Sequence, residues 1–290
     1  MENDNEKHIR GLHYMVVNFT KMHGLGNDFM VVDMISHHAH LRPEQIRRLA
    51  DRHIGIGFDQ LLLVEPPSKP SVDFRYRIFN ADGSEVEQCG NGARCFAVFV
   101  KEKKLTNKDC IQVETMKGDI ELNLTEEGRV LVNMGAPVFE PKAIPFLAET
   151  QNSVYSVNID GNEFQLSAIS MGNPHAVIQV DDIKTADVNT IGPLIEAHAL
   201  FPERVNVGFM EIVHKRFIKL RVFERGVGET LACGTGACAA VAAGINRNLL
   251  ESPVEVKLPG GNLKIDWKGN DAPLFMEGPA VSVFEGKIRI

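Results

Sequence analysis

Two stretches of this chain carry nearly the same phrase, and this repetition constrains the fold more than any other feature. Residues 85–97 read EVEQCGNGARCFA, and residues 229–240 read ETLACGTGACAA. Each contains a Glu, then a Cys, then Gly-x-Gly-Ala. Cys233 follows Cys89 by 144 residues, about half of the 290-residue chain. A repeat of that length is the size of a domain, whereas repeats of 20–50 residues indicate solenoids.

Further matches occur upstream of both cysteines and in the same order. RIFN (77–80) ends nine residues before the first cysteine, and RVFE (221–224) ends nine before the second. The matched positions are Asn80 with Glu224, Asn27 with Asn173 and Gln60 with Asn206, separated by 144, 146 and 146 residues. We interpret the chain as a duplication whose two domains are related by a pseudo-two-fold axis.

The sequence becomes helical after each cysteine. The predicted helices, 91–104 and 235–248, are apolar on every side in their first two turns, which is typical of buried helices. Two further helices are predicted at 43–53, with Pro at its start, and at 191–199. Short strands are predicted at 74–79, 111–115, 120–124, 130–134, 164–170, 176–180, 207–213, 218–223, 254–258 and 263–267.

These elements predict the α+β class. We expect two pseudo-symmetric domains, each a strand-rich, barrel-like sheet wrapped around a buried central helix, with the active site in the cleft between them. The first domain is expected at 17–133 plus 279–290 and the second at 134–278. Residues 1–16 match nothing in the second half and are interpreted as an N-terminal extension.

Composition excludes several classes of function. Hydrophobic residues make up 44% and charged residues 24%, and the net charge is −7. Without a basic block, nucleic acid and anionic membranes are not expected as partners. The start of the chain, MENDNEKHIR, does not resemble a signal peptide. Five cysteines, an odd number, argue against a disulfide framework, so we expect a cytoplasmic protein with free thiols.

The two matched cysteines suggest acid/base chemistry. Cys89 and Cys233 each come at the start of a predicted helix, where unpaired N–H groups and the helix dipole place positive potential. We therefore expect each thiol pKa to fall from about 8.5 toward neutrality. The Gly-x-Gly turns can bind a carboxylate through the same N–H groups.

Two such sites facing one another would flank a single carbon. One thiolate could remove an α-proton from one side while the opposite thiol delivers a proton to the other, which inverts the stereocentre. Helix ends would stabilise the enolate-like carboxylate that forms. No pyridoxal lysine site or nucleotide loop is evident, so no cofactor is expected.

Several motifs together resemble one known family. They are HGLGNDF (23–29), GIGFDQ (55–60), FNADGSEVEQCGNGARC (79–95), MGNPHAV (171–177), RVNVGF (204–209) and VFERGVGETLACGTGACAA (222–240). In order, from about residue 17 to 290, the chain resembles diaminopimelate epimerases. The resemblance implies an isomerase that works without pyridoxal phosphate. It would interconvert LL- and meso-2,6-diaminopimelate in lysine and peptidoglycan-precursor biosynthesis.

The resemblance also implies residue roles. Cys89 and Cys233 would be the catalytic acid/base pair, and His175 and Glu224 would tune their pKa values. The implied substrate-binding set is Asn27, Gln60, Asn80, Gly90, Asn91, Asn173, Asn206, Glu224, Arg225, Gly234 and Thr235. The residue types fit: Arg225 suits the distal carboxylate of the substrate, and the amides suit its ammonium groups.

The resemblance also implies an oligomeric state. A homodimer is expected from the family alone. Phe284 occupies a position where the family often has a tyrosine linked to dimer contact, and it lacks the hydroxyl that would make one dimer hydrogen bond.

Alternative functions remain open at this point. One is another cofactor-independent amino-acid racemase or isomerase of the same fold. A different class is a thiol redox or metal-binding protein. The cysteine spacings, 89 to 95 and 233 to 238, are longer than a zinc knuckle, so no metal is expected. Cys95 and Cys238 are interpreted as core residues, Cys110 as an ordinary strand or loop thiol, and His37, His38 and His40 as solvated.

Overall fold

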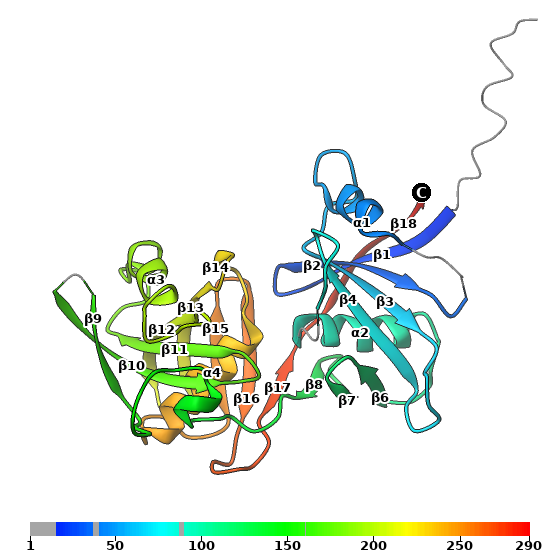
Figure 1. Cartoon of the computed structure of the whole chain (residues 1–290). Coiled ribbons are helices and arrows are strands. Elements are labelled where there is room, and N and C mark those ends of the chain that lie inside the picture. The colour runs from blue at the N-terminus through cyan, green and yellow to red at the C-terminus, as the bar shows by residue number, and fades with distance from the viewer. Residues whose placement is uncertain (1–15, 37–40, 87–89, 160) are drawn as a thin grey trace, which may run out of the picture.

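The computed structural model describes residues 16–36, 41–86, 90–159 and 161–290. The chain forms two lobes, each built of strands around one helix (Figure 1). The central helices are α2 (Gly90–Glu102) and α4 (Gly234–Asn246). This arrangement confirms the expected α+β fold of two similar halves.

The first lobe contains most of the N-terminal half and the last strand of the chain. Its elements besides α2 are β1 (Val16–Gly24), β2 (Asn27–Asp33), α1 (Pro43–Ala50), β3 (Gln60–Glu65), β4 (Phe74–Asn80), β5 (Glu85–Val86), β6 (Cys110–Thr115), β7 (Gly118–Leu124), β8 (Val130–Asn133) and β18 (Val281–Arg289). Its strands pair in the order β18–β1–β2–β3–β4–β6–β7–β8, and β5 forms a short hairpin with β4.

The second lobe repeats this order. Its elements besides α4 are a 3-10 turn, η1 (Pro141–Ala143), then β9 (Tyr155–Ile159), β10 (Asn162–Ser170), β11 (Pro174–Val180), α3 (Val188–Glu196), β12 (Asn206–His214), β13 (Phe217–Glu224), β14 (Gly228–Thr230), β15 (Val254–Leu258), β16 (Gly261–Asp266) and β17 (Phe275–Gly278). Its strands pair in the order β9–β10–β11–β12–β13–β15–β16–β17, with β14 on β13.

Strand registers repeat as well as strand order. The parallel pair β2–β3 sets Phe29 opposite Gln60, and the parallel pair β11–β12 sets His175 opposite Asn206. Two-residue turns join β6 to β7 and β15 to β16. The residue after each turn is a glycine with positive φ, 123° at Gly118 and 142° at Gly261, a conformation that side-chain-bearing residues rarely adopt.

Both central helices are largely buried: most side chains of α4 are small or apolar, and α2 buries Asn91 and Arg94 beside its apolar residues. In α4 the run from Ala237 to Ala243 is at most 1% exposed, and in α2 Phe96 and Ala97 are fully buried. Inner cores surround α2 and α4, and outer cores lie beneath α1 and α3. Within the described ranges, no helix has the length and apolarity that crossing a membrane requires.

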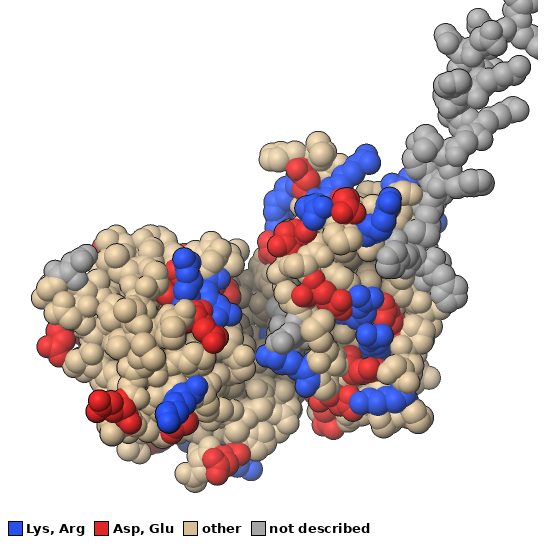
Figure 2. Space-filling view, in the orientation of Figure 1, with Lys and Arg blue, Asp and Glu red and all other residues tan. Residues whose placement is uncertain are grey.

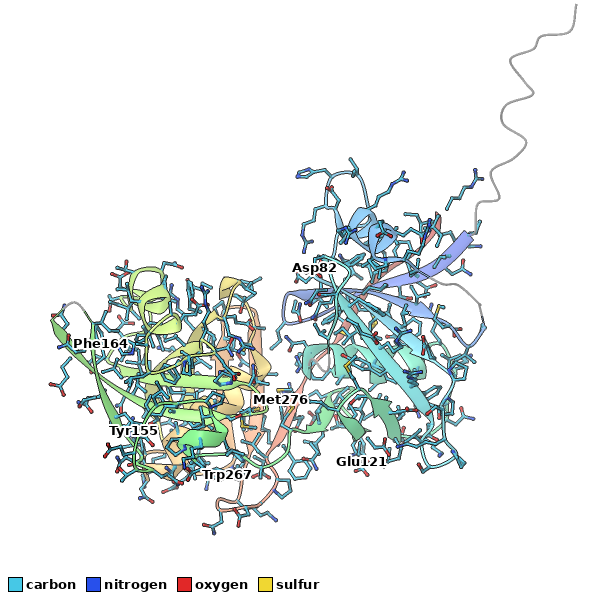
Figure 3. All side chains as sticks on the ribbon, in the orientation of Figure 1. Asp82, Glu121, Tyr155, Phe164, Trp267 and Met276 are labelled. Atoms are coloured by element: carbon cyan, nitrogen blue, oxygen red, sulfur yellow. The ribbon has the colours of Figure 1, made fainter. Side chains whose placement is uncertain are left out.

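The two lobes are joined through their sheets. β8 of the first lobe pairs antiparallel with β17 of the second, with Val132 opposite Met276. Met276 therefore lies at the junction of the lobes (Figure 3). The molecular surface is indented between the two lobes (Figure 2). On the face shown, the basic residues Lys and Arg are interspersed with the acidic residues Asp and Glu.

Candidate active site

The first-lobe candidates lie at one edge of its sheet. Asn27 begins β2, Gln60 begins β3 and Asn80 ends β4, and the strand register sets Gln60 opposite Asn80. Gln60 Nε2 donates to Asn80 Oδ1 at 3.0 Å. Gln60 Oε1 is buried and accepts no hydrogen bond within the described part of the chain. This edge therefore presents a desolvated acceptor oxygen.

The second-lobe candidates lie at the equivalent edge. Asn206 begins β12, Glu224 ends β13, and Asn173 directly precedes β11. Asn206 is 4% exposed, and its Nδ2 donates to the carbonyl oxygen of Pro174 at 2.9 Å. Its Oδ1 accepts the backbone N–H of Arg225 at 3.0 Å. The Asn206 side chain thus links the backbone at the start of β11 to the backbone just after β13.

Cys233 is the residue that caps the start of α4. It is extended, with φ −108° and ψ 104°, and only 4% exposed. Its Sγ lies 3.6 Å from Thr235 Oγ1, which also accepts a hydrogen bond from Asn173 Nδ2 at 3.4 Å. Glu224 and the backbone N–H of Gly236 also hydrogen-bond the sulfur. The thiol is surrounded by polar groups in an otherwise buried position.

Burial decides the pKa of Cys233. Loss of solvent raises the thiol pKa well above its ordinary value, and the Glu224 carboxylate raises it further. The Thr235 hydroxyl and the Gly236 N–H lower it, but they are outweighed. The expected fall toward neutrality is therefore wrong for Cys233, because the helix end acts against both desolvation and a neighbouring carboxylate.

The two predicted tuning residues are themselves shifted. His175 is 1% exposed, and burial, followed by the charge of Arg225, lowers its pKa to about 3. Its Nε2 lies 3.1 Å from Asn173 Oδ1, so the neutral ring donates there as the Nε2–H tautomer. Burial raises the pKa of Glu224, and a hydrogen bond from the Thr230 hydroxyl opposes that shift.

Arg225 lies at the rim of this edge. It is exposed, and its Nη1 donates to the carbonyl oxygen of Glu203 at 2.9 Å. A guanidinium tied to one neutral carbonyl near the surface can turn toward an arriving anion at low cost. Asn206 fixes its backbone but not its side chain.

The starts of the two central helices meet between the lobes. Asn91 Nδ2 donates to Asn27 Oδ1 at 3.2 Å and to the carbonyl oxygen of Ala232 at 3.1 Å. Asn91 Oδ1 accepts a 2.8 Å hydrogen bond from Arg94, which is fully buried. The side chain predicted to bind substrate is thus engaged within the protein, while its backbone remains at the helix start.

Glycines allow this close meeting of helices. A Cβ placed on Gly90 would lie 2.8 Å from Met276 Cε, and one on Gly234 would lie 3.1 Å from Met276 Sδ. The same Gly234 position is 3.7 Å from Asn91 Oδ1. The structure therefore brings Gly90, Asn91, Cys233, Gly234 and Thr235 to one place.

The other cysteines fit their expected roles. Cys95 and Cys238 are fully buried in the central helices, and Cys110 is exposed on β6. Cys110, Cys233 and Cys238 are free thiols. Cys89 lies outside the described residues, directly before Gly90 in the chain, and His37, His38 and His40 lie outside them too. The described residues contain no group of three or more His, Cys, Asp or Glu suited to a metal ion.

Two contributors to the site were not singled out from the sequence. Asp59 Oδ2 accepts a hydrogen bond from Asn27 Nδ2 at 3.1 Å, and Arg52 donates to Asp59 Oδ1 at 2.9 Å. The Thr230 hydroxyl donates a hydrogen bond to the Glu224 carboxylate. Asp59 stands beside Gln60 and Thr230 three residues before Cys233, so adjacency to the motifs was the available signal.

Comparisons with known sequences agree on one family. The family model for diaminopimelate epimerase matches residues 19–140 and 167–283. The diaminopimelate epimerase of Ectopseudomonas mendocina is 58% identical over 276 residues, covering 95% of this chain and all of that protein. That of Azotobacter vinelandii is 59% identical over the same length and the same coverage.

Solved structures share the fold at low identity. A Bacillus anthracis phenazine biosynthesis protein of the PhzF family has a TM-score of 0.66 at 18% identity, covering 95% of this chain and 100% of that one. A hydroxyproline epimerase from Agrobacterium vitis has a TM-score of 0.66 at 14% identity, covering 95% and 93%. The two-lobed architecture is therefore common to proteins of different sequence.

Proposed function

Because this chain belongs to the diaminopimelate epimerase family, we propose that Cys89 and Cys233 are the acid/base pair of its reaction. The chain is an isomerase that interconverts LL- and meso-2,6-diaminopimelate, a step of lysine and peptidoglycan-precursor biosynthesis. The observation that supports the catalytic pair best is the meeting of the two helix starts, with Cys233 at one and Gly90, the neighbour of Cys89, at the other.

The chemistry requires one thiolate and one thiol. The thiolate forms an S–H bond with the α-hydrogen, and the C–H electron pair passes to the α-carbon and its carboxylate. The opposite thiol then gives its proton to the other face and becomes the thiolate. Burial and Glu224 favour the protonated form of Cys233, so it starts as the proton donor. In the reverse direction the roles exchange.

The α-carboxylate would lie between the helix starts. The first N–H groups of an α-helix have no intrahelical acceptor, and the helix dipole adds positive potential. In this proposal the N–H groups of Gly90, Asn91, Gly234 and Thr235 bind the carboxylate. They stabilise the charge that grows on it as the α-proton leaves. Such binding favours the transition state over the bound substrate.

The polar edges of the two sheets would recognise the rest of the substrate. The buried acceptor Gln60 Oε1 suits an ammonium N–H, because it has a hydrogen-bonding capacity that the described chain does not use. Asn27, Asn80, Asn173, Asn206 and Glu224 lie on the same two edges. Arg225 is suited to a bidentate contact with the distal carboxylate.

Neighbouring groups would hold the pair in working protonation states. His175 is neutral across the physiological range, since its pKa is lowered to about 3. It can fix the orientation of Asn173, which contacts Thr235 beside the thiol. Glu224, in contact with Cys233, favours the thiol over the thiolate.

We extend the proposal to domains, assembly and compartment. The proposed domains are 17–133 with 279–290, and 134–278; the pairing of β18 with β1 supports placing the C-terminal strand in the first domain. On β18 the side chains of Val281, Val283 and Phe284 are 45%, 54% and 49% exposed. Within the described residues β18 pairs only with β1, so this apolar edge suits a second copy in a homodimer. Free thiols favour the reducing cytoplasm.

The test is a stereospecific assay with LL-diaminopimelate in D₂O and no added cofactor. Cys89→Ser and Cys233→Ser are each expected to lose turnover by orders of magnitude at an unchanged circular dichroism spectrum. The exposed thiol provides the matched control, Cys110→Ser, which should retain turnover. Wild-type product should carry deuterium at the inverted carbon. Near-normal turnover in either cysteine variant would end the proposed mechanism.

A further inference from the structure

We propose that two matched ion pairs, Arg77 with Glu85 and Arg221 with Glu229, position the two catalytic cysteines. This inference rests on the proposed function. In each pair the arginine lies on the strand, and the glutamate on the short partner strand, of the hairpin that leads to a cysteine. Each glutamate precedes its cysteine by four residues.

The two pairs have the same geometry. Arg77 Nε and Nη2 donate to the two oxygens of Glu85 at 2.7 and 2.8 Å. Arg221 Nε and Nη2 donate to the two oxygens of Glu229 at 2.6 and 2.8 Å. Both are bidentate contacts, which fix orientation as well as distance. The arginines, the glutamates and the cysteines are all separated by 144 residues.

The hairpins also repeat in register. Phe79 pairs with Glu85, and Phe223 pairs with Glu229. Both lobes therefore contain an ion pair of the same two residue types at the same position in the strand register. Surface ion pairs contribute little to stability, so preservation in both copies points to a role at the hairpin that precedes each cysteine in the chain.

The second hairpin needs an anchor beyond its own strands. β13 and β14 share three paired positions, and the turn between them is exposed, with Val227 75% exposed. Arg221 Nη1 donates to the carbonyl oxygens of Ile183 and Ala186, at 3.1 and 3.0 Å. Asn189 Nδ2 donates to Glu229 Oε2 at 3.1 Å. The pair therefore ties the hairpin to the segment that leads into α3.

The anchored strand β14 is linked to Cys233 indirectly, through Thr230 and Glu224. Thr230 follows Glu229 directly, and its hydroxyl binds Glu224, which hydrogen-bonds the thiol. Three residues separate Glu229 from Cys233. Displacement of β14 would move Thr230, Glu224 and the sulfur relative to one another. A misplacement of about 1 Å at a reacting group can cost about 100-fold in rate.

The pairs are suited to testing because they are partly exposed. The side-chain exposures are 30% and 28% for Arg77 and Glu85, and 23% and 22% for Arg221 and Glu229. Removal of a partly exposed pair has only a small effect on stability, so the variants should fold. A purely structural role would lower the melting temperature without a selective effect on one cysteine.

The experiment compares Glu85→Gln and Glu229→Gln with Glu251→Gln. Glu251 forms a 2.6 Å ion pair with Lys215 in the second lobe, away from the hairpin, and provides the matched control. The readouts are kcat and KM in both directions, melting temperature, and the rate at which iodoacetamide alkylates each cysteine, measured by peptide mass spectrometry.

Each hairpin variant is expected to lose about tenfold or more in kcat, with KM changed less than about threefold. Glu229→Gln should change alkylation at Cys233 and leave Cys89 unchanged, and Glu85→Gln should do the reverse. Arg221→Lys keeps the positive charge but cannot make the bidentate contact, so its kcat and alkylation should change as in Glu229→Gln. It replaces Glu229→Gln in the experiment if that variant fails to fold.

Wild-type kcat in the hairpin variants would overturn the proposal, as would equal changes at both cysteines. An effect no larger than that of Glu251→Gln would also overturn it. Alkylation does not depend on turnover, so it reports on the ion pairs even if the two-cysteine mechanism fails.

Discussion

Asn91 Nδ2 lies 3.1 Å from the carbonyl oxygen of Ala232, a residue 141 positions later in the chain. The bond joins the first turn of α2 to the peptide that precedes Cys233. Arg94 holds the other end of the same amide, and Asn27 accepts its second N–H. One buried side chain therefore links both helix starts and one polar sheet edge.

Asn91→Asp should test this link. The carboxylate keeps the size of the amide and an acceptor for Arg94, but it loses both donors. Leaving the buried Ala232 carbonyl without its partner costs about 1–3 kcal/mol. We expect kcat/KM to fall by about tenfold or more, with a lower melting temperature, measured by the epimerisation assay and differential scanning calorimetry.

The matched control is Asn152→Asp. Asn152 is exposed, and its Nδ2 contacts only Thr150 Oγ1 among the described residues. It should keep wild-type kcat/KM and melting temperature. Equal kcat/KM in the two variants would show that the link between the helix starts is dispensable.

Removal of the Glu224 carboxylate should lower the pKa of Cys233. The carboxylate raises that pKa by its charge and by its hydrogen bond, so Glu224→Gln leaves only burial to raise it. We expect the alkylation of Cys233 to begin at lower pH in the variant. Cys238, whose pKa burial raises to about 12, is the internal control, because Glu224 does not contribute to its shift. An unchanged or higher alkylation midpoint at Cys233 would contradict this assignment.

The neutral, buried His175 should make stability depend on pH. Its folded-state pKa, about 3, lies below the ordinary value of 6.5, so the unfolded chain binds more protons between these values. Its contribution is present above pH 6.5 and is lost as pH falls toward 3, by up to about 1.4 kcal/mol per pH unit.

Urea unfolding of wild type and His175→Gln between about pH 4 and pH 8 measures this slope. The variant should have the shallower slope on the acid side. His214→Gln, which removes an exposed ring, is the control for the loss of an imidazole elsewhere in the chain. Parallel curves for wild type and His175→Gln would refute the assignment.

Gly236→Ala should disturb the thiol directly. A Cβ at Gly236 would lie 3.2 Å from Cys233 Sγ and 3.0 Å from Val222 Cγ2, both tighter than ordinary contact. We expect kcat to fall by about tenfold while the helix is retained, measured by steady-state kinetics and circular dichroism. Gly208→Ala is the control, since its nearest neighbour is at 3.4 Å. Full activity in Gly236→Ala would mean that the sulfur need not keep this position.

The exposed apolar edge should control assembly. Val283→Arg places a charge on β18 at a side chain that is 54% exposed, and it should shift a dimer to monomer in sedimentation equilibrium. Val213→Arg, at a valine 45% exposed on β12, should leave the dimer intact. A monomeric wild type would contradict the homodimer proposal.

Local signals sufficed for the central helices and for many of the strands. The predicted helices 91–104 and 235–248 agree with α2 and α4, since runs of small and apolar residues after Gly-x-Gly are visible in sequence. Strands β1, β2 and β3 were not predicted. The apolar runs of β2 and β3 are continuous and buried, so they lack the alternation that identifies a half-buried strand, and β1 has polar residues at some of its buried positions. The helix expected at 43–53 ends at Ala50, because Asp51 is extended and binds the N–H groups of His53 and Ile54.

The repeated motif, read from the residues alone, was enough to predict two halves, their central helices and a matched set of amides. The position of those amides at the ends of paired strands came from the structure. The sign of the Cys233 pKa shift required the folded molecule. The start of a helix can be predicted from the local sequence. Desolvation of Cys233 and the approach of Glu224 instead depend on how the strands pack around α4. The same holds for Asn91, because its bond to Ala232 exists only where two distant segments are brought into contact.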